Sequence, residues 1–195
     1  MALSFPNTGV STGPWARLDS RTGIFMVSNA DGGKTPVDLT GKPISMALGD
    51  CEQGWLRVDA AGAEWIPISN GVWGTPPSPE HKPGVDVAIY SKDQFGDAPI
   101  RSCRGNSRGW NGFIAAVSET VEAAGGCKPE EWVTIKITKI TVIKIGQGTS
   151  IDVSFNLAPR EKWVTPPKIA EAKPEPKPAP KPVAQAAQVA PDDDF

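Results

Sequence analysis

The chain has 195 residues, of which 20 are glycine and 20 are proline. This length predicts one domain with room for a tail. The Gly and Pro content argues against an all-helical bundle, because both residues destabilise helix interiors. No apolar run approaches the roughly 20 residues of a membrane-spanning helix. A formal net charge of −2 excludes a globally basic nucleic-acid coat but allows a local basic face.

The composition divides the chain into a body, residues 1–164, and a tail, residues 165–195. The tail contains eight prolines, and over residues 173–182 proline alternates with other residues. Repeated proline lacks backbone donors and fixes φ, so this segment predicts a disordered, extended linker. All seven tryptophans precede the tail. We therefore expect the body to hold the core.

Short β-strands are predicted along the first half of the body by runs of apolar and β-branched residues bounded by turn residues. A hairpin is predicted where two such runs flank the small loop 60–63. The predicted strands cover residues 23–28, 44–48, 55–59, 64–68 and 85–90.

The best helix candidate covers residues 110–124. Phe113, Val117 and Val121 recur there at four-residue spacing, and Gly125 follows the run. This is the single helix that the pattern predicts.

A second hairpin is predicted near the end of the body. Residues 132–145 are rich in Ile, Val and Thr, and residues 151–157 alternate apolar with polar side chains. The apolar phase of the first strand changes after Lys139, which predicts a β-bulge or bend there. Antiparallel strands with one helix indicate a mainly β fold, either a small barrel or a sandwich, with long loops.

Enzyme signatures are scarce. His81 is the only histidine, and no phosphate-binding loop motif occurs. We interpret Asp86, Asp93 and Asp97 as solvated loop carboxylates. The three cysteines lack zinc-site spacing. We therefore expect no catalysis, no cofactor and no metal.

A cationic segment at residues 101–110 is the clearest binding signal in the body. It carries Arg101, Arg104, Arg108 and Trp110, contains no acidic residue, and has two glycines that allow close approach. Guanidinium groups pair with phosphates and stack on bases, and tryptophan stacks on bases as well. We interpret this segment as a nucleic-acid-binding loop, with an ordinary exposed loop as the alternative.

Three strand lysines, Lys136, Lys139 and Lys144, extend this candidate DNA-binding set. Trp55 and Trp65 are weaker candidates for base stacking, since one hairpin could place both on one face. Core packing is the default role of tryptophan. We expect four or five of the seven to be mostly buried.

The tail ends in Asp192, Asp193, Asp194 and Phe195. The terminal ring can enter an apolar pocket while the carboxylates contact basic residues at its rim. A flexible linker raises the local concentration of such a peptide near whatever the body binds. This ending predicts a docking peptide for a partner protein, although it could also be a solubilising terminus.

A body followed by a linker and an acidic, aromatic tip resembles the single-stranded-DNA-binding proteins of bacteria and their phages. The resemblance implies an oligonucleotide-binding barrel that coats single-stranded DNA without catalysis. It also implies that Asp192–Phe195 recruit replication, recombination or repair proteins.

Residues 1–7 show no secretory signal, and the odd cysteine count suits reduced thiols. Both observations predict a cytoplasmic protein of a bacterium or a phage-infected cell, with no membrane partner. A homo-oligomer remains allowed. Two alternative functions stay open, which are a structural or adaptor protein of a virus particle and a Trp-rich carbohydrate-binding module.

Overall fold

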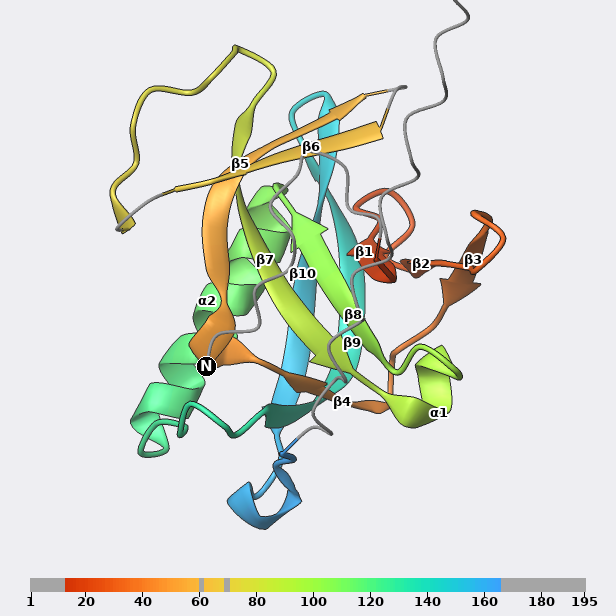
Figure 1. Cartoon of the computed structure of the whole chain (residues 1–195), viewed down its shortest axis with the longest axis vertical. Helices are drawn as coiled ribbons and strands as arrows, with labels where there is room; N and C mark the ends of the chain where they lie inside the picture. The colour runs from red at the N-terminus through yellow and green to blue at the C-terminus, as the bar shows by residue number, and fades with distance from the viewer. Residues whose placement is uncertain (1–12, 60–61, 69–70, 166–195) are drawn as a thin grey trace, which may run out of the picture.

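The computed structural model describes residues 13–59, 62–68 and 71–165 (Figure 1). The docking peptide predicted at Asp192–Phe195 and nearly all of the predicted linker lie outside the described residues. The strands are β1 (Trp15–Leu18), β2 (Phe25–Ser28), β3 (Lys34–Val37), β4 (Pro43–Met46), β5 (Glu52–Asp59), β6 (Gly62–Pro67), β7 (Lys82–Tyr90), β8 (Ile100–Gly105), β9 (Val133–Ile145) and β10 (Gly148–Leu157).

These strands form one mixed sheet in the order β10-β9-β4-β7-β8-β1-β2-β3, with the β5–β6 hairpin branching from β7. The mainly β class is therefore confirmed. The sheet is not closed into the predicted barrel, because β10 and β3 form its two ends. It is also not purely antiparallel, since β1 runs parallel to β8. The parallel pairing joins two strands that are far apart in the sequence.

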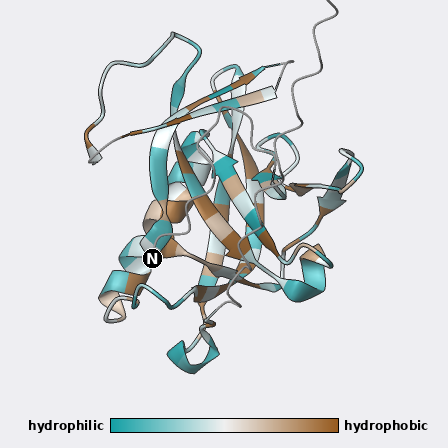
Figure 2. Ribbon diagram, in the orientation of Figure 1, coloured by the Kyte–Doolittle hydropathy of each residue, from teal (hydrophilic) through white to brown (hydrophobic). Residues whose placement is uncertain are grey.

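The larger of two hydrophobic clusters lies on one face of the sheet, which we call the core face. Alternation along each strand directs every second side chain to this face. Val133, Ile135 and Ile137 of β9 are fully buried there, as are Ile89 of β7 and Cys103 of β8. Figure 2 shows the corresponding concentration of apolar residues in the central strands. We call the opposite face the outer face.

Helix α2 (Arg108–Ala123) covers part of the core face and confirms the predicted helix. Its N-terminus is capped by Ser107, whose Oγ accepts a hydrogen bond from the Trp110 amide at 3.1 Å. Phe113 packs edge-on against Phe155 of β10, with ring centres 5.7 Å apart. The other described helices are α1 (Lys92–Phe95), η1 (Leu48–Asp50) and η3 (Arg160–Lys162).

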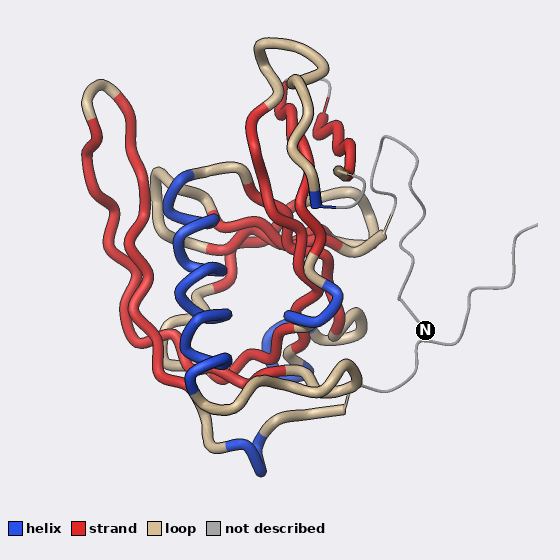
Figure 3. The backbone as a smooth tube through the Cα atoms, turned by 90° about the vertical axis from the view of Figure 1, so that its left-hand side faces the viewer, coloured by secondary structure: helices blue, strands red, loops and turns tan. Residues whose placement is uncertain are grey.

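The β9–β10 hairpin is confirmed, including its bulge. The register shifts between Ser154 and Phe155, which pair with Lys139 and Ile137, so Thr138 is the extra residue. Figure 3 shows the distal half of this hairpin extending beside α2. Val142, Ile143 and Ile145 near its tip are between 38% and 46% exposed.

The contact between α2 and β10 predicts opposite effects for two glycine-to-alanine substitutions in the same helix. A Cβ at Gly109 would overlap the backbone oxygen of Ile151, whereas a Cβ at Gly112 would meet nothing within 4 Å apart from the backbone of its own helix. We expect Gly109→Ala to lower the free energy of unfolding by about 1–3 kcal/mol through overpacking. Gly112→Ala, the matched control, should raise it by up to about 1 kcal/mol through helix propensity.

Urea denaturation followed by far-UV circular dichroism measures both changes. A stabilising Gly109→Ala would contradict the close contact between α2 and β10.

Candidate nucleic-acid interface

A cleft of about 270 Å³ separates the β5–β6 hairpin from the outer face of the sheet. One wall comes from the hairpin and includes Leu56 and Val58. The other comes from β1, β3 and β8. Its aromatic and cationic members are Trp15, Arg17, Lys34 and Arg104.

Strand alternation brings the β1 side chains into this cleft. Ala16 and Leu18 are 1% and 7% exposed and point into the core. Trp15 and Arg17 therefore point to the outer face. Lys34 of β3 lies with its Nζ 5.7 Å from the centre of the Trp15 ring. The result is a half-buried indole next to an exposed ammonium and an exposed guanidinium.

The charge in the cleft is predominantly positive. Arg17 and Lys34 line it as exposed cations, Arg104 lines it with its charge balanced by Asp86, and Asp59 is the one lining carboxylate. Asp59 lies 3.4 Å from the guanidinium of Arg57, on the same hairpin. This arrangement favours an anionic ligand with a flat, stackable group.

A buried ion pair lies beside the cleft on the outer face. Asp86 of β7 is 5% exposed and pairs directly with Arg104 of β8. The Arg104 guanidinium lies 4.9 Å from the centre of the Trp65 ring. The expectation that Asp86 is a solvated loop carboxylate is therefore wrong, because Asp86 lies within a strand beneath the β5–β6 hairpin. Asp93 and Asp97 are exposed, as expected.

The interpretation of residues 101–110 as a loop is also wrong. The segment forms β8, a short turn and the start of α2. Its two glycines serve packing, because a Cβ at Gly105 would overlap the Trp110 ring and one at Gly109 would overlap β10. Trp110 is 2% exposed and donates its Nε1 hydrogen to the Val85 carbonyl at 3.1 Å. Its ring therefore presents no surface to a base.

Arg101 takes a structural position on the core side of β8. It is 6% exposed, and its Nη1 donates to the carbonyl oxygen of Ser28 at 2.7 Å. The guanidinium also lies 5.3 Å from the centre of the Phe95 ring. Burial lowers the pKa of Arg101. These contacts tie β8 to β2 and α1 and leave the side chain out of reach of a surface ligand.

Tryptophan burial follows the expectation, since four of the seven, Trp55, Trp65, Trp110 and Trp132, are at most 9% exposed. Trp55 packs edge-on against Trp73 at 5.0 Å, and Trp65 packs against Arg104. Neither candidate presents an open face for base stacking. Trp73 is 41% exposed.

The remaining cations of the predicted set do not form one groove. Arg108 is exposed at the start of α2. Lys139 of β9 lies opposite Ser154 of β10, and Lys144 lies opposite Thr149. Because Ser154 and Thr149 are an odd number of residues apart, the two lysines point to opposite faces of the hairpin. Lys136 shares the outer face with Lys139. Strands β4 and β7 separate all three lysines from β8, so only Arg104 of the predicted set lines the cleft.

The sequence interpretation missed Trp15, Arg17 and Lys34. A weak signal was present, since residues 15–18 alternate large or charged with apolar side chains. Their convergence depends on the parallel pairing of β1 with β8, which joins residues more than 80 positions apart.

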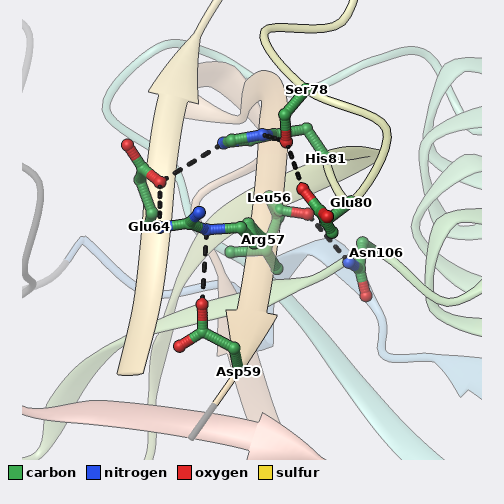
Figure 4. A network of polar contacts seen from close by, with 8 residues as sticks. All are labelled: Leu56, Arg57, Asp59, Glu64, Ser78, Glu80, His81 and Asn106. Atoms are coloured by element: carbon green, nitrogen blue, oxygen red, sulfur yellow. Dashed lines mark hydrogen bonds and ion pairs between the residues drawn. The ribbon is translucent and has the colours of Figure 1, made fainter. Parts of the chain in front are cut away.

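A second polar cluster joins the loop before β7 to the β5–β6 hairpin (Figure 4). The His81 Nδ1 lies 2.8 Å from the Ser78 Oγ, and its Nε2 lies 3.5 Å from a carboxylate oxygen of Glu64. Ser78 donates its hydroxyl hydrogen to Glu80 at 2.7 Å, and this bond lowers the pKa of Glu80. Because that hydrogen is directed to Glu80 instead of His81, the geometry differs from an activated serine nucleophile. The cluster instead brings the loop next to β6, where Glu64 also binds Arg57 at 2.9 Å.

The three free thiols are not activated either. Burial and the nearby Asp86 raise the pKa of Cys51 to about 12. Burial also raises the pKa values of Cys103 and Cys127. Each thiol therefore remains protonated at neutral pH, which is the opposite of a catalytic thiolate.

Within the described residues, no group of three or more His, Cys, Asp or Glu side chains is placed to hold a metal ion. No helix in the same part of the chain is long and apolar enough to span a membrane. Comparison with known proteins finds no matching family model, no matching curated protein and no matching solved structure. The cleft and the sequence of the tail are therefore the two features of the chain that point to a function.

The environment of Arg101 predicts a stability defect when its charge is removed. Arg101→Met leaves the Ser28 carbonyl without its guanidinium donor, so we expect the free energy of unfolding to fall by about 1–3 kcal/mol. Arg108→Met, at an exposed position, should change it by no more than about 0.5 kcal/mol. Urea denaturation distinguishes the two. Equal stabilities would show that Arg101 has no structural role.

Proposed function

We propose that this protein binds single-stranded DNA through the cleft between the β5–β6 hairpin and the outer face. The observation that supports this proposal is the half-buried Trp15 ring flanked by Lys34 and Arg17. A nucleobase can stack on the indole while the two cations contact the adjacent phosphates. Because every base has an aromatic face, such binding tolerates any sequence.

The volume of the cleft suits one nucleotide unit. Neighbouring nucleotides would continue along the surface outside it, so the strand is held at a stacking point instead of being enclosed. This mode needs no catalytic group. The protonated thiols and the structural role of the Ser78–His81 contact agree with a binding mode that has no catalytic group.

The tail adds a second element to the proposal. In the proteins that this chain resembles in layout, an acidic tip recruits replication, recombination and repair proteins. We extend that role to Asp192–Phe195 on the basis of their sequence. The linker between the cleft and this tip would hold a recruited partner close to the bound strand.

Binding is tested by the fluorescence anisotropy of a labelled 30-mer of oligo-dT at three salt concentrations. We expect saturable binding whose affinity falls as salt rises, because phosphate contacts release counterions. Trp15→Ala should weaken binding by about 1–3 kcal/mol, the contribution of one stacked base. The double variant Arg17→Ala/Lys34→Ala removes two phosphate contacts. It should therefore also reduce the slope of log K against log salt by about 1.4.

Lys128→Ala, an exposed lysine outside the cleft, is the matched control and should bind as the wild type does. No anisotropy change with the wild-type protein would exclude the proposed function and favour an adaptor role for the tail. A carbohydrate-binding module would show salt-insensitive binding to glycans instead.

Deletion of residues 191–195 tests whether the acidic tip competes with DNA for the basic cleft. We expect the shortened chain to bind oligo-dT more tightly, with the largest gain at low salt, where charge interactions are least screened. A variant with Asp192, Asp193 and Asp194 changed to Asn isolates the effect of charge. Unchanged or weaker binding after the deletion would contradict this competition.

A further inference from the structure

Asp86 is a buried carboxylate, and within the described part of the chain its side-chain hydrogen bonds come from the neighbouring strand β8. Its Oδ1 accepts from the Ser102 Oγ at 2.7 Å, and its Oδ2 accepts from the Arg104 Nε at 2.8 Å. The Arg104 Nη2 also donates to Oδ2. Removing a carboxylate from water is costly unless such bonds compensate for it. The position of Asp86 therefore fixes the orientation of the guanidinium opposite it.

Arg104 is held from two directions. Asp86 engages Nε and Nη2, and the Trp65 ring lies 4.9 Å from the guanidinium carbon. Nη1 has no hydrogen bond to any residue within 13–59, 62–68 or 71–165. The side chain is 18% exposed and lines the cleft. The nitrogen that remains available thus belongs to a guanidinium already fixed in place.

Arg104 could contribute to DNA binding in two ways, by its net charge or by a directed hydrogen bond. Because Asp86 and Arg104 neutralise one another, the pair adds no net charge that would attract DNA. Any contribution to binding must come from a directed hydrogen bond, which is stronger when its donor is charged. Preorganisation by Asp86 would lower the entropic cost of making that bond.

We propose that Asp86 is a positioning residue that orients Arg104 so that its Nη1 donates to a phosphate oxygen of the bound strand. This inference rests on the proposed binding of single-stranded DNA. It adds a directed phosphate contact to a cleft in which Arg17 and Lys34 act as mobile surface charges.

Asp86→Asn tests the proposal through the sign of its effect on affinity. The substitution preserves shape but makes the site more positive by one charge. If Asp86 only neutralised Arg104, the variant would bind oligo-dT more tightly. Positioning predicts the reverse, and we expect binding about tenfold weaker, the effect of losing one charged hydrogen bond. Tighter or unchanged binding would overturn the proposal.

Asp59→Asn is the matched control, since it makes the same change of charge at the carboxylate that lines the cleft, whereas Asp86 lies beside the cleft. We expect it to bind oligo-dT as tightly as the wild type or slightly more tightly. If Asp59→Asn weakened binding as much as Asp86→Asn, the loss would not be specific to Asp86 and the positioning role would be rejected.

Arg104→Lys provides a second test that does not depend on the folding of Asp86→Asn. Lysine keeps the charge but cannot bond Asp86 through two nitrogens while directing a third outward. We expect a loss similar to that of Asp86→Asn, and no further loss when both changes are combined. Wild-type affinity in Arg104→Lys would overturn the proposal.

The same titrations separate this inference from the proposed function. If the wild-type protein does not bind oligo-dT, both fail. If the wild type binds and Trp15→Ala weakens binding, but Asp86→Asn tightens it, only the inference fails. Inorganic phosphate, compared with chloride at equal ionic strength, tests the source of the anion. If Asp86→Asn weakened the binding of inorganic phosphate but left the affinity for oligo-dT unchanged, the site would belong to free phosphate and the contact with the strand would be overturned.

Discussion

The pairing of β8 with both β7 and β1 is the constraint on which the candidate site depends. The register on one side places Arg104 opposite Asp86, and the register on the other places Ser102 opposite Trp15. Since side chains alternate along a strand, these four residues share the outer face. A shift of one residue would exchange Arg104 with Cys103 and bury a charge in the apolar core.

The same alternation explains why neighbouring arginines have different roles. Arg101 and Arg104 are three positions apart on β8, so they point to opposite faces. On the core side, Arg101 donates to the Ser28 carbonyl. On the outer side, Arg104 meets a carboxylate and an indole at the edge of the cleft. Identical side chains in one short strand thus act as a structural brace and as a candidate ligand contact.

The strands and the helix that the sequence predicted are those with strong local patterns. The β9–β10 hairpin, its bulge beside Lys139 and helix α2 all follow from spacing within a single element. The errors concern features that depend on long-range pairing, which are the closure of the sheet, the burial of Asp86 in β7, and the roles of β8 and β1. The polar segment 101–110 resembles a loop because its arginines find their partners elsewhere in the chain. The importance of Trp15 depends on a parallel pairing with Ser102, which no local pattern can indicate.

The β5–β6 hairpin forms one wall of the cleft. Its two strands differ in how many other strands they pair with. Strand β5 is hydrogen-bonded to β7, whereas β6 pairs only with β5 among the described strands. Elements with few neighbours open at a lower free energy than the global unfolding transition. A local opening of β6 would therefore widen the cleft without unfolding the sheet. The Glu64–His81 pair, 3.5 Å apart, lies where it would oppose that opening, so residues outside the cleft would influence how long the proposed ligand stays bound.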